Sequence, residues 1–531
     1  TLQWPDSSDF GESGDRYSDF VKTITGRDGV VYVGGNDGAL HGFDTDTGKE
    51  VLAYFPAHLA STDTHKGYHY LTDRRYTHRY YVDGTPVVSD AYIKAWPGGS
   101  KAWRTVLIGS DRAGGKGLFA LDVTNPGNFK KQDLNKARQV VLWEFSDADD
   151  PNLGYTVSEP TIALLNNGRW AAIFGNGYGN AGSGKAELFI LYLDGGLDGK
   201  WSEGWDNDYF RITTGSGSPK YPNGLWTPAV IDLDGDHIAD RVYAGSWWGQ
   251  MWAFDLSSKY PKDWKVAHKG KPLFTAKDKI KGQNEQPITT RPQIIRHPCS
   301  SGGFEPNLLV LFGTGQYLVD ADDDPYLVDS ERQSFYGVWD QGDGGLQRAN
   351  LQQQVLLPGA GASGRVIVTK EVDYAGASGP VKYGWYIDLN PGERVVNDYL
   401  VRGKAVYFNT QIPDDRPCAF GGSGWLMSIN TCDGGSPDAP EFDYNGDGKI
   451  DPAGDTAAIA GTRYAFAGKK FASSKGIPAA PAIIGNKRYT TGTRASGDPN
   501  TQMDVSVIAD LEARRGRLSW DHLFPSRETG K

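Results

Sequence analysis

Short apolar segments separated by glycine-containing turns recur along the chain. In each copy, a strand ending in Gly, a short turn that contains Gly, and a second strand ending in Asp follow one another. The pattern predicts two antiparallel strands joined by a turn, because Gly supplies the positive φ of tight turns and apolar residues suit a half-buried sheet. The copies span residues 31–44, 106–122, 172–194 and 241–255, with a looser one from 310–318 to 334–340.

Several copies follow a further short strand that opens with proline, where no ladder hydrogen bond is lost. Residues 140–147 supply a fourth strand, and Pro86, Pro160, Pro228 and Pro292 lie 74, 68 and 64 residues apart. We therefore expect an all-β, modified β-propeller of mostly four-stranded blades with long inserted loops. About seven blades are predicted, and six or eight also fit. A solenoid or a set of β-sandwiches is the structural alternative, although sandwiches would not repeat this pattern.

Composition supports strands and turns over helices. The 531 residues include 69 Gly, 27 Tyr and 16 Trp, and the net charge of −10 argues against sequence-independent binding to nucleic acid or anionic lipid. No apolar run approaches the roughly 20 residues of a membrane span. The chain opens without an initiator Met or a visible signal peptide. We expect residues 1–531 to form one propeller domain cut from a larger protein.

An acidic loop at residues 232–240 is the sharpest local motif. Asp232, Asp234, Asp236 and Asp240 occupy positions 1, 3, 5 and 9, and Ile238 at position 7 offers its backbone carbonyl. Alternate carboxylates in a tight loop converge on one point, and Ca²⁺ takes 6–8 oxygen ligands. The loop lacks the Gly at position 6 and the Glu at position 12 of an EF-hand. It therefore predicts an EF-hand-like calcium site in a hairpin, with an Asp-rich turn as the alternative.

A second loop at residues 443–451 repeats this spacing. It predicts a weaker calcium site, because one carboxylate is replaced by an amide and Asp455 falls one residue beyond position 12. The predicted ligands are Asp443, Asn445, Asp447, the Lys449 carbonyl and Asp451.

Three cysteines allow a single disulfide within the chain. Cys418 and Cys432 bracket a Gly-rich stretch that could form a hairpin, so their pairing is predicted, in an oxidising compartment. Two buried free thiols are the alternative, and Cys299 is then left over.

The sequence contains none of the enzyme motifs HExxH, GxSxG or a Walker loop, and no catalytic residue is predicted. Four histidines fall between residues 58 and 78, but their Tyr-rich, Gly-containing surroundings do not favour a zinc site.

Several of these segments together resemble the C-terminal region of PilY-type pilus proteins. The resemblance runs in order from residue 31 to about residue 430 and includes VYVGGNDGALHGFD, GLWTPAVIDLDGDHIADRVYAGSWWGQMWAFDL and GSGWLMSIN. It implies a roughly seven-bladed propeller at the end of a longer secreted protein whose N-terminal part is absent. It also implies one calcium loop, which maps onto Asp232, Asp234, Asp236, the Ile238 carbonyl and Asp240.

The same resemblance implies a function at the cell surface of a Gram-negative bacterium, at the pilus tip or outer membrane. It implies roles in type IV pilus biogenesis, in opposing pilus retraction during twitching motility, and in adhesion to surfaces or host cells, a virulence trait. Minor or major pilins and a host-cell receptor are the implied partners. The tripeptide Arg-Gly-Asp is absent, which puts integrin binding in doubt.

An enzyme is the competing interpretation. Residues 31–55 are also similar to the repeat of pyrroloquinoline-quinone-dependent dehydrogenases, which are periplasmic propellers that use calcium. Those enzymes contain many more similar short repeats, and most have adjacent cysteines, a pair that does not occur in this chain. A third interpretation is a propeller in which calcium is only structural.

Overall fold

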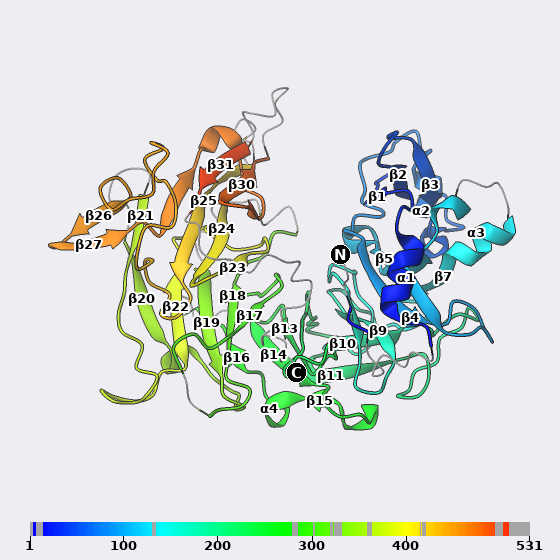
Figure 1. Cartoon of the computed structure of the whole chain (residues 1–531), viewed down its shortest axis with the longest axis horizontal. Coiled ribbons are helices and arrows are strands. Elements are labelled where there is room, and N and C mark those ends of the chain that lie inside the picture. The colour runs from blue at the N-terminus through cyan, green and yellow to red at the C-terminus, as the bar shows by residue number, and fades with distance from the viewer. Residues whose placement is uncertain are drawn as a thin grey trace. The chain divides into compact units, whose positions relative to one another are not determined.

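The computed structural model describes residues 4–6, 14–129, 134–278, 285–300, 303–318, 322, 332–357, 364–414, 416, 421–493 and 503–508. Within these residues the chain is almost entirely β-strand and turn, as predicted (Figure 1). It divides into two compact units, the first with residues 1–244 and 253–266 and the second with residues 245–252 and 267–523.

The first unit contains three antiparallel sheets whose strands follow chain order. Each four-stranded sheet places a predicted hairpin between the proline-opened strand and the fourth strand, as in a propeller blade. The strands of the three sheets are β1 (Val30–Gly34), β2 (Leu40–Asp44), β3 (Glu50–Tyr54); β4 (Val87–Ile93), β5 (Ala102–Ser110), β6 (Gly117–Asp122), β7 (Val141–Ser146); and β8 (Thr161–Leu164), β9 (Trp170–Gly175), β10 (Lys185–Tyr192), β11 (Tyr209–Gly217).

A five-stranded sheet follows, and the division between the units falls within it. Its strands are β12 (Ala229–Ile231), β13 (Arg241–Gly245), β14 (Gln250–Asp255), β15 (Lys265–Val266) and β16 (Phe274–Thr275).

The second unit contains a ten-stranded sheet in the order β17-β18-β19-β22-β20-β21-β28-β25-β24-β23, together with two small sheets. The ten strands are antiparallel except for the parallel pair of β20 and β22. Because this sheet continues across several hairpins, the described residues do not divide into seven separate four-stranded blades, and the count of seven stays a prediction. The strands are β17 (Gln293–Arg296), β18 (Leu308–Gly313), β19 (Ser334–Asp340), β20 (Gln352–Leu357), β21 (Gly364–Val368), β22 (Gly384–Asp388), β23 (Leu400–Arg402), β24 (Ala405–Pro413), β25 (Gly422–Asn430), β26 (Thr456–Ile459), β27 (Thr462–Ala465), β28 (Gly468–Phe471), β29 (Ala482–Ile484), β30 (Lys487–Thr491) and β31 (Met503–Val507).

Helices are few and short. None of those in the described part of the chain is long and apolar enough to cross a membrane. The α-helices are α1 (Tyr17–Ile24), α2 (Gly67–Tyr70), α3 (Leu134–Val140) and α4 (Ala267–Gly270), and the 3-10 helices are η2 (Ala57–Leu59), η3 (Arg112–Gly114), η4 (Pro126–Asn128), η5 (Pro261–Asp263), η7 (Arg348–Asn350) and η8 (Ser473–Lys475).

Aromatic side chains pack the sheets of the first unit against one another. Trp170 of β9 lies edge-on to Trp4 and Trp103, with ring centroids 5.0 and 5.7 Å away. All three side chains are buried, and burial of large apolar area is the main favourable term in folding. This packing holds the start of β9 near the acidic loop, since the centroid of the Trp4 ring also lies 6.4 Å from that of His237.

One disulfide lies in the second unit, and it corrects the predicted partner of Cys432. Cys432 bonds to Cys299, with their Cα atoms 5.7 Å apart, and Cys418 lies outside the described residues. The two half-cystines are 133 residues apart in sequence. Local sequence favoured the nearer cysteine, whereas the sheet brings Cys299 after β17 next to the end of β25. The bond itself agrees with an oxidising compartment.

Candidate metal centre

The loop of residues 232–240 joins β12 to β13. Its ends are held together by the ladder, because the Asp240 N–H donates to the Ile231 carbonyl at 2.9 Å. Between these ends the backbone takes two left-handed turns, at Gly235 with φ 88° and at His237 with φ 70°. The loop therefore folds back on itself, and side chains at alternate positions turn inward.

Each acidic side chain of this loop accepts hydrogen bonds from the loop's own backbone. Asp232 accepts from the N–H groups of Gly235 and His237 at 2.7 and 2.8 Å. Asp236 accepts from the Ile238 N–H at 2.8 Å, and Asp240 accepts from the Leu233 N–H at 2.8 Å. These bonds fix the carboxylates in place before any ion binds.

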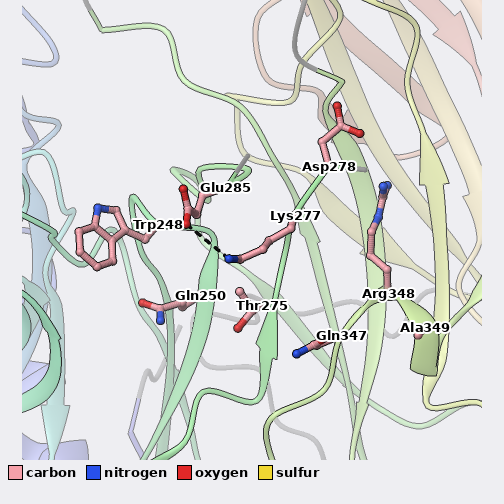
Figure 2. Close-up of a pocket in the computed structure, with 9 residues that line it drawn as sticks. All are labelled: Trp248, Gln250, Thr275, Lys277, Asp278, Glu285, Gln347, Arg348 and Ala349. Atoms are coloured by element: carbon pink, nitrogen blue, oxygen red, sulfur yellow. Dashed lines mark ion pairs between the residues drawn. The ribbon is translucent and has the colours of Figure 1, made fainter. Parts of the chain in front are cut away.

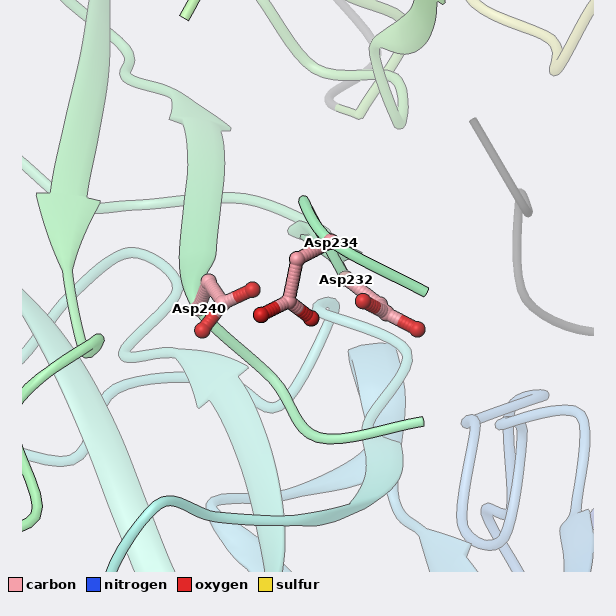
Figure 3. A group of neighbouring side chains, drawn as sticks. All are labelled: Asp232, Asp234 and Asp240. Atoms are coloured by element: carbon pink, nitrogen blue, oxygen red, sulfur yellow. The ribbon is translucent and has the colours of Figure 1, made fainter. Parts of the chain in front are cut away.

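Three of the predicted ligands converge. Carboxylate oxygens of Asp232, Asp234 and Asp240 lie within 4.8 Å of one another, and in Figure 3 Asp234 lies between the other two. Asp232 and Asp240 are buried, and Asp234 is exposed. Such a group of oxygens fits a hard divalent cation. Asp236, the fourth predicted carboxylate, is not part of this group.

Burial and mutual repulsion disfavour the ionised form of two carboxylates in this loop, Asp236 and Asp240. Partial desolvation, with a further contribution from the neighbouring carboxylates, raises the pKa of Asp236 to about 6. Burial likewise raises the pKa of Asp240, and Asp234 and Asp232 add to the effect. Both shifts have the sign expected for acidic groups that a positive charge would stabilise.

A neighbouring strand supplies a contact that the loop's sequence could not reveal. The Asn166 side-chain amide follows β8 and donates to the Asp240 carboxylate at 3.2 Å and to the Ala239 and Leu256 carbonyls, each at 3.1 Å. Asn166 thus anchors the loop's last residue to the adjacent sheet. Sequence analysis missed this residue because nothing in the loop's spacing points to a partner 74 positions away.

The second acidic loop lies in the second unit and repeats the same backbone pattern. Asp443 accepts from the N–H groups of Gly446 and Gly448 at 2.6 and 2.8 Å, as Asp232 does from the equivalent positions. Asp447 accepts from the Lys449 N–H at 2.8 Å, as Asp236 does from Ile238. The described residues of this loop show no group of three converging carboxylates.

Asp455, not Asp451, takes the position in the second loop that Asp240 holds in the first. The Asp455 carboxylate accepts from the Tyr444 N–H at 2.6 Å and from the Asp451 N–H at 3.0 Å. The Asp451 carboxylate instead accepts hydrogen bonds from the N–H groups of Ala453 and Gly454, the residues that follow it. Asp455 is 2% exposed. Asp455 lies four residues beyond position 9, because residues 452–454 lengthen the return of the loop.

A polar cavity of about 490 Å³ lies in the second unit and was not predicted from sequence. Figure 2 shows Lys277 and Glu285 paired across it, with their charged atoms 3.5 Å apart. Arg348, which also borders it, is held by Asp388 and Ser334. Its lining residues include two cations, Lys277 and Arg348, and two carboxylates, Asp278 and Glu285. Its described lining includes no His, Cys or Ser.

The comparisons with known proteins agree on one family. A family model described as the PilY1 beta-propeller domain matches residues 8–362, about two thirds of the chain. The type IV pilus biogenesis factor PilY1 of Pseudomonas aeruginosa PAO1 is 36% identical over 498 residues, which cover 85% of this chain and 39% of that protein. A PilY1 homolog of Xylella fastidiosa is 33% identical over 548 residues, covering 96% of this chain and 34% of the relative.

A solved structure extends the match to the fold. The crystal structure of the Pseudomonas aeruginosa PilY1 C-terminal domain is 30% identical and covers 96% of this chain and 99% of its own, with a TM-score of 0.71. The chain therefore has an all-β propeller fold. It spans about two fifths or less of the length of the two full-length relatives.

Proposed function

The chain belongs to the PilY1 family, and from that premise we propose that it is the propeller portion of a type IV pilus biogenesis factor. Its proposed place is the cell surface, at the pilus tip or outer membrane, as part of a secreted protein. Its proposed partners are pilins, with a host-cell or surface receptor for adhesion. The proposed role is binding and regulation, not catalysis, in keeping with relatives that are named as biogenesis factors.

Calcium is the proposed ligand of the loop at residues 232–240. The observation that carries this proposal is the convergence of Asp232, Asp234 and Asp240 within 4.8 Å. Asp236 and the Ile238 carbonyl, at positions 5 and 7 of the loop, complete the proposed ligand set. All five are oxygen donors, which suits Ca²⁺ and disfavours Zn²⁺, a cation that prefers nitrogen and sulfur.

A second, weaker calcium site is proposed at residues 443–451. Its proposed ligands are Asp443, Asn445, Asp447 and the Lys449 carbonyl, with Asp455 in the place that the spacing predicted for Asp451. The shared hydrogen-bond pattern of the two loops supports this proposal. Fewer carboxylates should weaken the affinity, because each carboxylate contributes charge to the site.

In this proposal calcium acts as a switch on pilus behaviour. In the free loop the carboxylates repel one another beside β12 and β13, and in the bound loop the ion neutralises them. The two states would differ in the surface offered to pilins, and so in pilus assembly, retraction and twitching. If calcium is only structural, its removal lowers stability and leaves these functions unchanged while the protein remains folded.

The binding half is tested by calorimetric titration of Ca²⁺ into wild type and Asp240→Ala. We expect at least a tenfold weaker first site in Asp240→Ala, and no change in Asp46→Ala, which removes an exposed carboxylate in the turn between β2 and β3. Equal heats in wild type and Asp240→Ala would show that the loop is not the site.

The regulatory half is tested in cells that carry Asp240→Lys, whose ammonium group replaces the ion's charge. We expect altered twitching and surface piliation, with normal amounts of the folded protein. Unchanged twitching and piliation would reject the switch and leave the structural role.

A further inference from the structure

The segment between β3 and β4 carries a basic and aromatic surface on an otherwise acidic chain. Residues 65–80 contain four Lys or Arg and one Asp, a net charge of +3. The chain as a whole carries −10, so the remaining residues carry −13. We call the exposed Lys, Arg and Tyr side chains of this segment the basic–aromatic patch, and they are Lys66, Arg74, Arg75, Tyr76, Arg79 and Tyr80.

The segment is folded against the first sheet. The Tyr68 hydroxyl donates to the Pro56 carbonyl at 2.7 Å, and its ring lies against Gly38 in the turn between β1 and β2. In Figure 1 α2, which contains Tyr68, accordingly lies beside β2 and β3. The Tyr81 hydroxyl closes the other end by donating to the Gly67 carbonyl at 3.0 Å.

Arg79 ties the patch together from within. Its guanidinium lies 3.5 Å from the centre of the Tyr70 ring, and its Nη1 donates to the His65 carbonyl at 3.1 Å. The Tyr70 and Tyr76 rings lie 5.4 Å apart. The patch is therefore held in shape before any partner arrives, which reduces the entropy lost on binding.

Two cations of the patch form no ion pair with a carboxylate among the described residues, although Asp73 attracts one of them, Arg75. Lys66 lies 3.7 Å from Asp63, and Asp73 pairs with His65 at 3.2 Å. The guanidinium groups of Arg74 and Arg75 form no such ion pair, although they are adjacent and exposed. Like charges held side by side repel, and an anionic partner would relieve that repulsion.

Exposed aromatic rings accompany these cations. Tyr76 is 39% exposed and Tyr80 is 51% exposed. The rings of His78 and Tyr80 pack edge to face, with their centroids 5.3 Å apart. Exposed Tyr and Arg are the residue types that contribute most to protein–protein interfaces. The combination gives both an apolar contact and directed hydrogen bonds.

We propose that the basic–aromatic patch docks an acidic surface of a folded pilus subunit, a partner that rests on the proposed function. A compact acidic surface can end where the patch ends. An extended polyanion such as single-stranded DNA would instead continue onto a chain that carries −13 outside the patch. Charge interactions fade over about 8 Å at physiological salt, so the local excess of positive charge, +2 when Asp63 is counted with residues 65–80, governs a compact contact.

The test measures binding of the full chain to the purified globular domain of each pilin from the same bacterium, by biolayer interferometry at 50, 150 and 500 mM NaCl. We expect one pilin domain to bind, more weakly as salt rises. The Arg74→Glu, Arg75→Glu double variant should weaken binding at least tenfold, and Tyr76→Ala with Tyr80→Ala about fivefold, both with unchanged circular dichroism.

The matched control is Lys259→Glu with Lys262→Glu. These two lysines flank the exposed Tyr260, with their Nζ atoms 5.1 and 5.7 Å from its ring centre, so the control makes the same charge change beside the same kind of ring. We expect it to keep wild-type affinity.

Three results overturn the inference. Full pilin binding by the patch variant, or an equal loss in the control, rejects the patch and leaves the pilus role intact. Binding of a dT20 oligonucleotide or of phosphatidylserine vesicles, with no pilin domain bound, rejects the protein partner. No binding by any pilin domain rejects both the patch and the pilin partnership, and calcium titration still judges the metal site separately.

Discussion

A buried histidine in the first unit should make stability fall with rising pH. His58 Nε2 lies 2.8 Å from Asp111 and its Nδ1 lies 3.0 Å from Glu144. The His58 side chain is 9% exposed and that of Asp111 is fully buried. Although burial opposes the charged imidazolium, the hydrogen bonds and charges of Asp111 and Glu144 prevail and raise the pKa of His58 to about 9.

The size of the effect follows from that pKa. An unfolded His titrates near 6.5, so the folded value of about 9 corresponds to about 3 kcal/mol of stability. Because the folded pKa is the higher one, this stability is complete below pH 6.5 and is lost as the pH rises through 9. Glu144 stays ionised throughout, since its hydrogen bonds outweigh its burial and lower its pKa to about 2.

The assay is urea unfolding followed by tryptophan fluorescence at pH 6, 7, 8 and 9. The difference in unfolding free energy between wild type and His58→Gln should shrink by about 3 kcal/mol across this range. His65 is exposed and pairs with Asp73, and His65→Gln is the matched control. Its unfolding free energy should change with pH in the same way as that of wild type. Parallel curves for wild type and His58→Gln would refute the reasoning.

Three further changes should lower stability by separate mechanisms. Cys432→Ser removes the disulfide to Cys299 and should cost about 2–4 kcal/mol in urea unfolding, with equal midpoints under reducing conditions. Trp170→Ala leaves a buried cavity and should cost about 3–5 kcal/mol, whereas Trp205→Ala, 53% exposed, should cost under about 1 kcal/mol by the same measurement. Asp455→Asn should cost about 1–3 kcal/mol without calcium, measured by thermal melting in EGTA, because three backbone N–H groups, those of Tyr444, Asn445 and Asp451, lose a charged acceptor. A wild-type midpoint for Cys432→Ser under oxidising conditions, for Trp170→Ala in urea, or for Asp455→Asn in EGTA would contradict the corresponding prediction.

Local sequence patterns predicted several of the hairpins in the fold. The hairpins around β5–β6, β9–β10 and β13–β14 lie where short apolar segments and Gly-containing turns predicted them. Such information is contained within about 20 residues, because strand pairing in a hairpin depends on its turn. The number of blades was not accessible in this way, since the ten-stranded sheet joins strands that are distant in sequence.

In the candidate metal centre, too, local spacing predicted some features, and contacts between distant segments were missed. Three of the predicted ligands, at positions 1, 3 and 9 of the first loop, lie close together, and whether they bind calcium stays a prediction. Asn166, Asp455 and the partner of Cys432 were missed because each contact depends on how separate strands or a lengthened loop return. The pairing of His58 with Asp111 and Glu144 was likewise beyond local spacing.

The most direct test of the calcium proposal is anomalous scattering from crystals soaked in excess CaCl₂. The account predicts one strong anomalous peak within about 2.3–2.6 Å of oxygens of Asp232, Asp234 and Asp240. An empty loop with these carboxylates apart, at full calcium in the soak, would contradict it.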